Sequence, residues 1–597
     1  MNGKYLYFMA STNYGPSTGW LEMSSIDRPV RRSIYLVVLN ATEPSPLLPE
    51  TGDEPTPPPQ PPAQTPPAQP APPAPRAVTV RIDPNGIGQR ILAVNVPVGD
   101  YSNLAAGAAG SFYYTEPIIP SGATGFRLQR YELRTRAAAP FLEGVRSYSV
   151  SADKKKLLYQ ADANRWGVVA TERPAKVGDG PLNVAQLETR VDPRAEWSQI
   201  YRETWRLQRD YFYDAKMHGA DWQAIYEKYK PLLAHVGHRA DLGYVIAMMG
   251  GELTVGHSYL LGAGDVPSED PVSVGLLGAD FEIENGRYRI KRIYTGENWN
   301  PDLRAPLSAP GIQVAEGDYV LEVNGRPLAP PANVYSLFEG TANRQTLIRV
   351  NKTPSLEGSR LITVVPVASE DTLRTRAWIE NNRRLVDKLS NGKLAYVWLP
   401  NTANPGYTYF TRYFYAQQDK DGAVIDERYN HGGMVADYIV NELDRKLMGY
   451  FALRDGTPST SPIAGIYGPK VMLINESAGS GGDALPYMFR LRKIGPLIGT
   501  RTWGGLVGTL GLPATIDGGG ITAPTLAFYN LKGEWDVENI GVAPDIEVEY
   551  TAADVIKGRD PQLERAVQEA LRLLELNPVR RVPRPAPIDR VSKGKER

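Results

Sequence analysis

The stretch KVMLINESAGSGGDALPYMFR, residues 470–490, joins an apolar run, a knot of small residues and a helix-like segment without a spacer. The apolar run predicts a strand, and the segment from residue 481 onward predicts a helix. Ser480 therefore falls at a helix N-terminus, where backbone N–H groups point outward without acceptors. That position suits an attacking hydroxyl, because the N–H of Gly481 is then placed to receive the oxyanion formed when Ser480 Oγ adds to a carbonyl carbon.

A second glycine-rich strand end lies upstream in DERYNHGG, residues 426–433. A glycine N–H of this motif supplies a second oxyanion donor if the two strand ends converge. For SAGSGG taken alone, a flexible turn or an ordinary helix cap is the commoner explanation. The catalytic interpretation therefore depends on the surrounding sequence.

The sequence from residue 372 to residue 577 alternates between strand and helix patterns. Strand patterns occur at KLAYVWLP, GAVIDERY, KVMLIN and PLIG, with helix patterns such as VADYIVNELDRK between them. This βαβ rhythm predicts a layered α/β domain. Its last helix has Asp560 as N-cap and Pro561 at the first helical position. A single apolar stripe predicts that this helix packs: Leu563, Ala566, Val567, Ala570, Leu571 and Leu574.

A β-rich unit of about a hundred residues precedes the α/β domain, with GLLGADFEI near its start and VAEGDYVLEVNGRPL near its middle. It resembles a PDZ domain, because Gly317–Asp318 and Asn324–Gly325 match the GD…VNG turn and hairpin of that family. The resemblance implies that Gly275 to Phe281 is a carboxylate-binding loop, whose backbone N–H groups receive a peptide C-terminus. The expected donors are Gly275, Leu276, Leu277 and Gly278. A plain hairpin in a structural barrel is the alternative.

A helical module is predicted between residues 192 and 261. Aromatic and apolar residues recur at helical spacing from Trp197 to Phe212, and two more helix patterns follow in DWQAIYEKYKPLLAHV and ADLGYVIAMMGGEL. The module ends in GELTVGHSYL, which contains His257.

The first 190 residues read as short antiparallel strands, at KYLYFMAS, SIYLVVLN, SFYYTEP and GFRLQRYELRTR. KYLY at 4–7 and KLLY at 156–159 are weakly similar, as blades of a β-propeller are. A propeller needs at least about four blades, and only two or three fit here, so we expect a partial propeller. Prolines dominate residues 54–75, which predicts an exposed, stiff insertion that is a spacer or, alternatively, a PxxP ligand.

Composition narrows the classes of partner and chemistry. The chain has 597 residues, and its 66 basic and 66 acidic side chains cancel, with no basic block before the short tail at 578–597, so nucleic-acid binding is not expected. Because the chain has no cysteine, disulfides, thiolate zinc sites and a cysteine nucleophile are excluded. No apolar run approaches the roughly 18 residues that span a membrane, and the first residues lack the pattern of a signal peptide. We expect a soluble protein, and a chain without cysteine is compatible with either a cytoplasmic or a periplasmic location.

The order of these modules, together with RYNHGG, NESAGSGGD and WDVENIGVAPD, resembles the C-terminal portion of tricorn protease and its bacterial homologues. These proteins are related to the C-terminal processing peptidases, whose SASASE motif aligns its nucleophile with Ser480 and its acid with Asp483. The resemblance implies a serine peptidase that acts on oligopeptides or unfolded chains, without a metal or organic cofactor, as a monomer or homo-oligomer. It implies a partial β-propeller at 1–190, a helical domain at 191–265, a PDZ-like domain at 266–368, an α/β (ββα, crotonase-like) domain at 369–577 and a flexible tail at 578–597.

The general base must differ from that of the processing peptidases, which use a lysine about 25 residues after the serine. This chain has TWGGLVG there, with Gly505 in place of the lysine, so a serine–lysine pair is excluded. Five histidines remain: His218, His235, His238, His257 and His431. By the resemblance His257 is the general base, Glu538 in GEWDVENIGVAPD orients it, and Gly432 and Gly481 donate to the oxyanion.

One position departs from the tricorn pattern, in which a serine before the histidine links it to the glutamate. Here that position is Gly256, so a water molecule or Ser258 would have to make the link, or the activity is weak. The departure keeps a noncatalytic peptide-binding protein as an alternative. A metal hydrolase based on His235 and His238 is a further alternative, although a third ligand is not evident.

Overall fold

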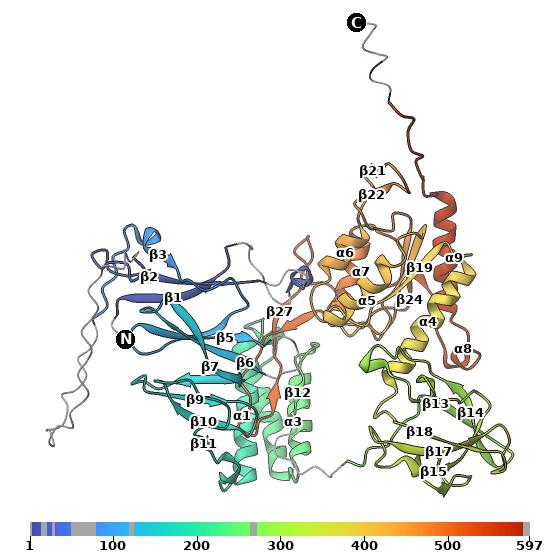
Figure 1. The fold of residues 1–597 in the computed structure, drawn as a ribbon, viewed down its shortest axis with the longest axis horizontal. Coiled ribbons are helices and arrows are strands. Elements are labelled where there is room, and N and C mark those ends of the chain that lie inside the picture. Colours follow the sequence, from blue (N-terminus) through green and yellow to red (C-terminus); the bar gives the residue numbers. More distant parts are fainter. Residues whose placement is uncertain are drawn as a thin grey trace. The chain divides into compact units, whose positions relative to one another are not determined.

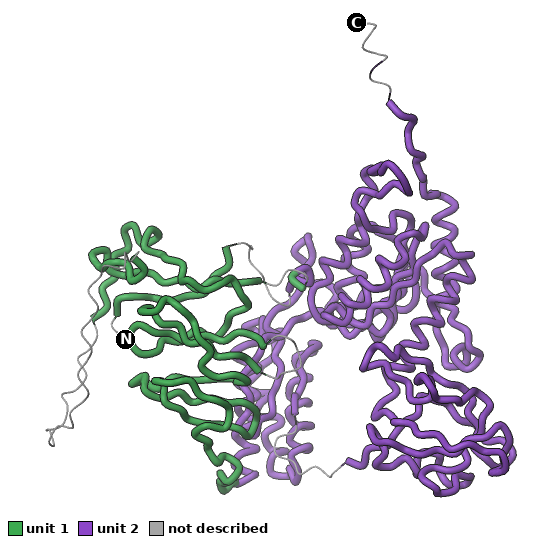
Figure 2. Tube along the Cα trace, in the orientation of Figure 1, with its two compact units in different colours: residues 1–19, 25–191 green, residues 20–24, 192–597 purple. Residues whose placement is uncertain are grey.

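The computed structural model describes residues 3–12, 21–26, 30–48, 79–118, 125–262, 271–588 and 591. Its contacts divide the chain into unit 1, residues 1–19 and 25–191, and unit 2, residues 20–24 and 192–597 (Figure 2). The proline-rich insertion expected at 54–75 lies outside the described residues. Within the described ranges, no helix has the length and apolar character needed to cross a membrane.

Unit 1 consists of successive antiparallel sheets, which confirms the strand patterns of this region. The sheets are β1 (Tyr5–Ala10), β2 (Ser33–Val38) and β3 (Ile91–Ala93); β4 (Ser102–Ala106), β5 (Ser111–Pro117), β6 (Phe126–Glu132) and β7 (Ala137–Val145); and β8 (Ser147–Val150), β9 (Lys156–Gln160), β10 (Trp166–Ala170) and β11 (Pro181–Leu182). Alternation along β5 builds two cores, because Phe112 and Tyr114 pack with the first sheet and Tyr113 packs with the third. The described strands do not form a closed sheet.

The long segment of unit 2, residues 192–597, begins with the predicted helical module, which the structure confirms (Figure 1). Its helices are α1 (Pro193–Tyr211), α2 (Trp222–Tyr229) and α3 (Arg239–Gly251). Asp192 caps α1 by accepting from the backbone N–H groups of the first turn. Trp205 and Trp222 each donate the indole N–H to the other's backbone carbonyl, at 2.9 and 3.0 Å, and this pair joins α1 to α2 in the core.

The PDZ-like unit is an antiparallel sheet in the order β13-β14-β15-β17-β18, with β16 paired to β15. The strands are β13 (Ala279–Glu284), β14 (Arg287–Ile293), β15 (Tyr319–Val323), β16 (Arg326–Pro327), β17 (Thr346–Asn351) and β18 (Arg360–Val364). The predicted hairpin is present between β15 and β16, because Asn324 and Gly325 both have positive φ, at 49° and 76°.

The α/β domain is a parallel sheet in the order β19-β20-β23-β24-β28, lying between two layers of helices (Figure 1). Its strands are β19 (Leu394–Trp398), β20 (Gly422–Asp426), β23 (Lys470–Ile474), β24 (Leu497–Gly499) and β28 (Ile546–Glu547). Its helices are α4 (Asp371–Leu389), α5 (Asn404–Tyr415), α6 (Asp437–Leu443), α7 (Gly481–Leu491), α8 (Ala552–Ile556) and α9 (Pro561–Leu576). Every residue of β19, β20 and β23 is buried, as expected for strands covered on both faces.

Three short antiparallel pairs complete unit 2. They are β12 (Leu260–Leu261) with β26 (Gly520–Ile521), β21 (Gly449–Phe451) with β22 (Ser459–Ser461), and β25 (Val507–Thr509) with β27 (Pro524–Ala527). The pair β12–β26 is the important one for the site, because it joins the segment after the helical module to the α/β domain.

Helix α9 has the predicted start, since Asp560 caps it by accepting from the Leu563 N–H at 2.9 Å and Pro561 is its first residue. The predicted stripe is buried except at Leu571, which is partly exposed. The helix packs on β20, β23 and β24. The expected packing of this helix is therefore confirmed.

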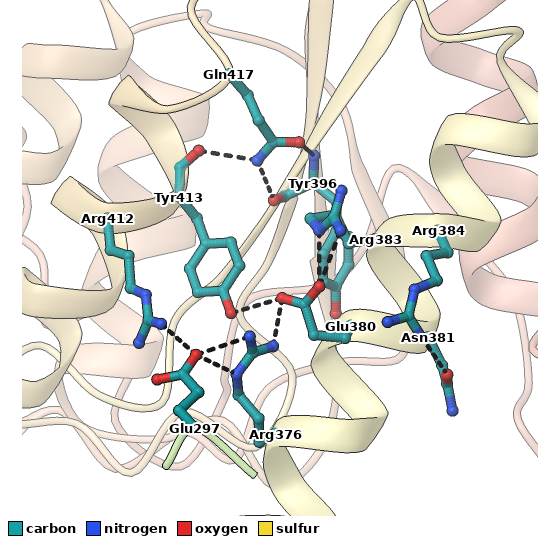
Figure 3. A network of polar contacts seen from close by, with 10 residues as sticks. All are labelled: Glu297, Arg376, Glu380, Asn381, Arg383, Arg384, Tyr396, Arg412, Tyr413 and Gln417. Carbon is teal, nitrogen blue, oxygen red and sulfur yellow. Dashed lines mark hydrogen bonds and ion pairs between the residues drawn. The ribbon is translucent and has the colours of Figure 1, made fainter. Parts of the chain in front are cut away.

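A buried carboxylate joins the PDZ-like unit to the α/β domain (Figure 3). Glu297, which follows β14, accepts from Arg376 of α4 at 2.9 Å and also from Arg412 of α5. On the same face of α4, Glu380 accepts from the Tyr413 hydroxyl of α5 at 2.9 Å. Because one acidic side chain is shared by two helices, the PDZ-like unit is held against the start of the α/β domain.

A second buried ion network fixes the end of β20, from which the RYNHGG loop departs. The Arg428 guanidinium, wholly buried, donates to Asp426 at 2.7 and 2.9 Å and to Asp560 at 2.9 and 3.0 Å. Asp560 is the N-cap of α9, so the network joins the glycine loop to the helix that covers the sheet.

We predict that Arg428→Ala destabilises the α/β domain by about 3 to 5 kcal/mol, because it leaves two buried carboxylates without their partner. Denaturant unfolding monitored by circular dichroism measures the change. The control is Arg581→Ala, which removes an exposed ion pair with Asp421 and should cost about 0.5 kcal/mol or less. Equal losses in the two variants would contradict the prediction.

Candidate active site

Ser480 occupies the sharp turn between β23 and α7. It is the N-cap residue of α7, with φ 59° and ψ −114°, a conformation that side-chain-bearing residues rarely adopt. Its backbone N–H donates to Asp483 Oδ2 at 2.8 Å. The cap has the geometry of a capping box, in which the Asp483 N–H lies near Ser480 Oγ, and Ser480 also lines the cavity described below.

Asp483 organises the loops around the serine. Its buried carboxylate also accepts from the N–H groups of Gly504 and Gly505, both at 2.9 Å, and from the Thr502 hydroxyl at 2.5 Å. The segment TWGG, where the processing peptidases carry their lysine, is therefore folded onto the first turn of α7. Gly505 serves this packing as a backbone donor.

The two expected oxyanion donors, Gly481 and Gly432, differ in their hydrogen bonding. Gly481 is the first residue of α7. The N–H of Gly432 donates to Asn430 Oδ1 at 2.9 Å. The next residue, Gly433, lies beside Gly481, with its nitrogen 3.1 Å from where a Gly481 Cβ would be. Among the residues that the structure describes, neither the Gly433 nor the Gly481 N–H has an acceptor.

Position 432 can hold only a residue without a side chain. It has φ 75°, and a Cβ there would lie 2.6 Å from the Cβ of Ser480. A residue with a side chain would therefore be strained and would also push the serine from its position. The contact agrees with the expectation that the two glycine-rich strand ends converge.

His257 belongs to the turn between α3 and β12 and is held by contacts with the α/β domain. Its carbonyl oxygen accepts from the Thr522 hydroxyl at 2.6 Å, and the Asn539 side chain donates to the Thr254 carbonyl at 2.7 Å. The His257 imidazole lies 5.5 Å from the Trp503 indole, centre to centre. Burial lowers the pKa of His257, and the charge of Asp483 opposes this only in part.

Glu538 accepts a hydrogen bond from the backbone of Gly256, the position where the tricorn pattern has a serine. Its Oε1 accepts from the Gly256 N–H at 2.7 Å. Its Oε2 and the Nδ1 of His257 are both buried, and in the described part of the chain neither has a hydrogen-bond partner. The hydroxyl of Ser258, the other expected link, accepts from the buried Gln208 of α1 at 3.0 Å. Burial raises the pKa of Glu538, and the Gly256 N–H opposes that rise.

Trp503 is a site residue that the sequence reasoning missed. Its indole covers the loop of the nucleophile, since a Cβ on Gly479 would lie 2.6 Å from the ring, and it also faces His257. The backbone N–H of Trp503 donates to the Ala478 carbonyl at 2.9 Å. The motif TWGGLVG was read only for its missing lysine, and the large aromatic residue beside two glycines was the available signal.

The other histidines lie in different surroundings. His218 contacts the Tyr213 hydroxyl and, at 2.9 Å, the Leu253 carbonyl. His238 caps α3 by accepting from the Ala240 N–H at 3.1 Å, and His235 is exposed. His431 borders a separate hollow with Trp378 and Trp398. In the residues placed by the structure, no group of three or more His, Asp or Glu side chains is arranged to hold a metal ion.

The expected carboxylate-binding loop of the PDZ-like unit is occupied by the chain itself. Gly275 donates to the Phe338 carbonyl at 2.9 Å, and Leu276 donates to the Val367 carbonyl at 2.8 Å. Gly278 donates to the carboxylate of Glu370 at 2.6 Å, while the side chain of Leu277 is in the core. A peptide C-terminus would have to displace Glu370 from this loop.

A cavity of about 370 Å³ opens beside Ser480 and both glycine donors. Its walls come from α7, the segment 506–508 and the strand segment 526–531, with Leu21 from the N-terminal part of the chain. None of the described residues that line it carries a charge. The cavity therefore fits an apolar side chain attached to the carbonyl that Ser480 would attack.

Comparison with protein families gives three matches along the chain. Residues 193–251 match the tricorn protease C1 domain, residues 275–369 the tricorn protease PDZ domain, and residues 393–548 peptidase family S41.

Individual relatives extend over nearly the whole chain. The chain is 33% identical to tricorn protease homolog 1 of Streptomyces coelicolor, over 98% of this chain and 55% of the relative. It is 31% identical to a putative tricorn-like protease C-terminal subunit of Sulfurisphaera tokodaii, over 96% of this chain and 64% of the relative. The crystal structure of the tricorn protease superimposes with a TM-score of 0.79 at 27% identity, covering 96% of this chain and 54% of that one. The chain thus spans about half to two thirds of the length of these relatives.

We predict that the His257 ring titrates below the ordinary histidine pKa of about 6.5. The cause is burial beneath Trp503, so Trp503→Ala should raise this pKa toward the ordinary value by admitting water. NMR titration of ¹⁵N-histidine-labelled protein measures both values, with His257→Ala to assign the signal. An identical pKa in the Trp503→Ala variant would show that another group controls the ring.

Proposed function

Because the chain belongs to the tricorn protease family, we propose that it hydrolyses peptide bonds as a serine peptidase with Ser480 as the nucleophile. The observation that carries the proposal is the arrangement around Ser480. Ser480, on a strained helix N-cap, lies beside two glycine N–H groups and an uncharged cavity. That combination serves acyl transfer, since it holds a carbonyl by its oxygen and by its side chain at once.

His257 is the proposed general base. Ser480 Oγ adds to the carbonyl carbon while its proton passes to the imidazole, and the Gly481 and Gly433 N–H groups hold the resulting oxyanion. When the C–N bond breaks, the imidazolium returns the proton to the leaving amine and an ester remains on Ser480. Water then gives a proton to the same ring as its oxygen adds to the ester carbon. The C–O bond to Ser480 breaks while the imidazolium returns that proton to Ser480 Oγ, and the acid is released.

Glu538 is proposed as the positioning residue for His257. Its Oε1 holds the backbone at Gly256, and its free Oε2 and the free Nδ1 of His257 have the chemistry to share one bridging water. A carboxylate that accepts a hydrogen bond from Nδ1–H through such a bridge fixes the ring tautomer, which leaves Nε2 to act as the base.

The cavity beside Ser480 supports a preference for substrates with an apolar residue before the cleaved bond. Its walls are leucines, valines, methionines and aromatic rings, and burying a cationic side chain there without a partner would be costly. Burying a leucine-sized side chain contributes about 1.5 to 3 kcal/mol.

The remaining expectations about organisation become part of the same proposal. We assign a partial β-propeller to residues 1–190, and its support is that β4 contacts both β1 and β8, as inner strands of neighbouring blades do. The helical domain at 191–265 carries the base. The PDZ-like domain at 266–368 precedes the crotonase-like peptidase domain at 369–577. Assembly into a homo-oligomer and a cytoplasmic location complete the proposal by family likeness.

We predict that Ser480→Ala abolishes peptide hydrolysis, by roughly 10⁴-fold or more, and leaves the fold intact because only a hydroxyl is lost. Hydrolysis of an unfolded casein and labelling by a fluorophosphonate measure the loss together. His257→Ala should suppress both signals near neutral pH. The control is His235→Ala, an exposed histidine, which should change neither signal. Wild-type turnover in Ser480→Ala would refute the assignment, and a wild type that binds peptides without labelling would favour a noncatalytic protein.

We predict that Gly256→Ser keeps or raises the acylation rate constant, by at most the roughly 1 to 3 kcal/mol that one charge-assisted hydrogen bond supplies. A Cβ at this position lies 3.1 Å from Glu538 Oε1, so the carboxylate must shift slightly and can then bond to the new hydroxyl. Glu538→Gln should lower the rate in both backgrounds, more sharply when the serine is present. Stopped-flow acylation in a double-mutant cycle measures this coupling.

The matched control for the cycle is Gly251→Ser, at a glycine with open space around its Cβ position. It should show no coupling with Glu538→Gln. If the cycle at Gly256 is additive and Glu538→Gln leaves the acylation rate of the native background unchanged, Glu538 does not position His257.

A further inference from the structure

A short segment from the N-terminal region belongs by its contacts to the unit that carries Ser480. Residues 21–24 are part of unit 2, whereas residues 3–12 before them and 30–48 after them are part of unit 1. The segment forms a short 3₁₀ turn, Met23–Ser25. The sequence analysis attached no role to it.

The segment is anchored to the start of α6. The backbone N–H of Met23 donates to Asp437 Oδ1 at 2.7 Å and to the Val435 carbonyl at 3.2 Å. Met23 itself is completely buried. A single buried residue that donates to two acceptors fixes the position of its neighbours along the chain.

The anchor is continuous with the wall of the catalytic cavity. Val435, which accepts from Met23, lines the cavity, and so does Leu21, two residues before the anchor. Leu21 is 41% exposed, so it borders the mouth of the cavity on one side and solvent on the other. Among the described lining residues, Leu21 is the one contributed from outside the α/β domain.

We infer that residues 21–24 are a specificity-determining wall of this cavity, inserted from the N-terminal β region. The inference rests on the proposed function, because it assigns to the cavity the side chain whose carbonyl Ser480 attacks. Leu21 then selects an apolar side chain at that position. Val435 and Met434, in the segment that follows the Gly433 donor, line the cavity with Leu21, so the wall and the oxyanion donor are mechanically connected.

The test is a change of charge at Leu21 in the full chain. Leu21→Asp places a carboxylate at the mouth of an uncharged cavity. It should raise kcat/KM for peptides with arginine before the cleaved bond, relative to leucine, by about ten-fold or more. Leu21→Ala should lower kcat/KM for the leucine peptide by about ten-fold without favouring arginine. The control is Leu6→Asp, at a leucine of β1 that is 56% exposed and does not line the cavity.

A second pair of variants tests the anchor. Asp437→Ala removes an acceptor of the Met23 N–H, whereas Asp437→Asn keeps an oxygen at that place. Hydrogen exchange at Met23 should accelerate in the alanine variant only. The same variant should lose preference for leucine over arginine, as Leu21→Ala does, while the asparagine variant retains it.

Labelling by a fluorophosphonate without a peptide portion separates this inference from the proposed function. Normal labelling with an altered leucine-to-arginine ratio supports the wall, and normal labelling with an unchanged ratio in Leu21→Asp overturns it. No labelling or hydrolysis in the wild type refutes the peptidase proposal. In that case hydrogen exchange at the Met23 N–H still tests whether the segment is docked. Slow exchange in the wild type that becomes fast in Asp437→Ala supports docking, and fast exchange in the wild type refutes it.

Discussion

The carboxylate of Asp483 is the interaction on which the arrangement of the site depends. It accepts from Ser480, Thr502, Gly504 and Gly505, so one buried charge fixes the strained turn of the nucleophile and the loop that covers it. The same charge influences more distant groups, because it opposes the effect of burial on His257 and adds to the effect of burial in raising the pKa of Glu427. Four hydrogen-bond donors satisfy the acceptor capacity of this carboxylate, which is why it can be buried.

The groups proposed for catalysis are brought together from separate parts of the chain. Ser480 and its glycine donors follow strands of the parallel sheet, whereas His257 follows the helical module. The strand pair β12–β26 and the buried ion pair between Arg239 and Asp517, 2.6 Å apart, hold these parts together. An ion pair buried on both sides contributes more to choosing one geometry than to net stability, and one geometry is what a proton transfer requires.

Local rules predicted the elements well, and contacts between distant residues set the limits of that prediction. The cap and stripe of α9, the Asn324–Gly325 hairpin and the position of Ser480 follow from residues close in sequence, so the pattern alone identified them. One side-chain amide, Asn430, competes for the N–H of Gly432, an expected oxyanion donor. No periodicity encodes such a competition.

Other features were not predictable because they join segments far apart in the chain. Leu21 lies more than four hundred residues from the cavity it borders, and the occupant of the PDZ-like loop, Glu370, follows that loop by about ninety residues. Glu538 was assigned by resemblance, yet its contact at Gly256 is with the backbone N–H, and a backbone donor leaves no signal in the residue type. Packing between modules decided each of these cases.

The Glu370 carboxylate, which accepts from the Gly278 N–H, limits how well the PDZ-like unit can bind the C-terminus of another chain. An acceptor tethered within the same chain acts as a competitor at an effective concentration on the order of millimolar or higher. Glu370 is also paired with Arg374, at 2.7 Å, which holds it in place. A free C-terminus at micromolar concentration therefore competes poorly, and the loop behaves as a receptor saturated by its own ligand. Because that ligand is the N-cap of α4, releasing it would also disturb the first helix of the α/β domain, so recruitment through the loop would be thermodynamically coupled to the order of the domain that carries Ser480.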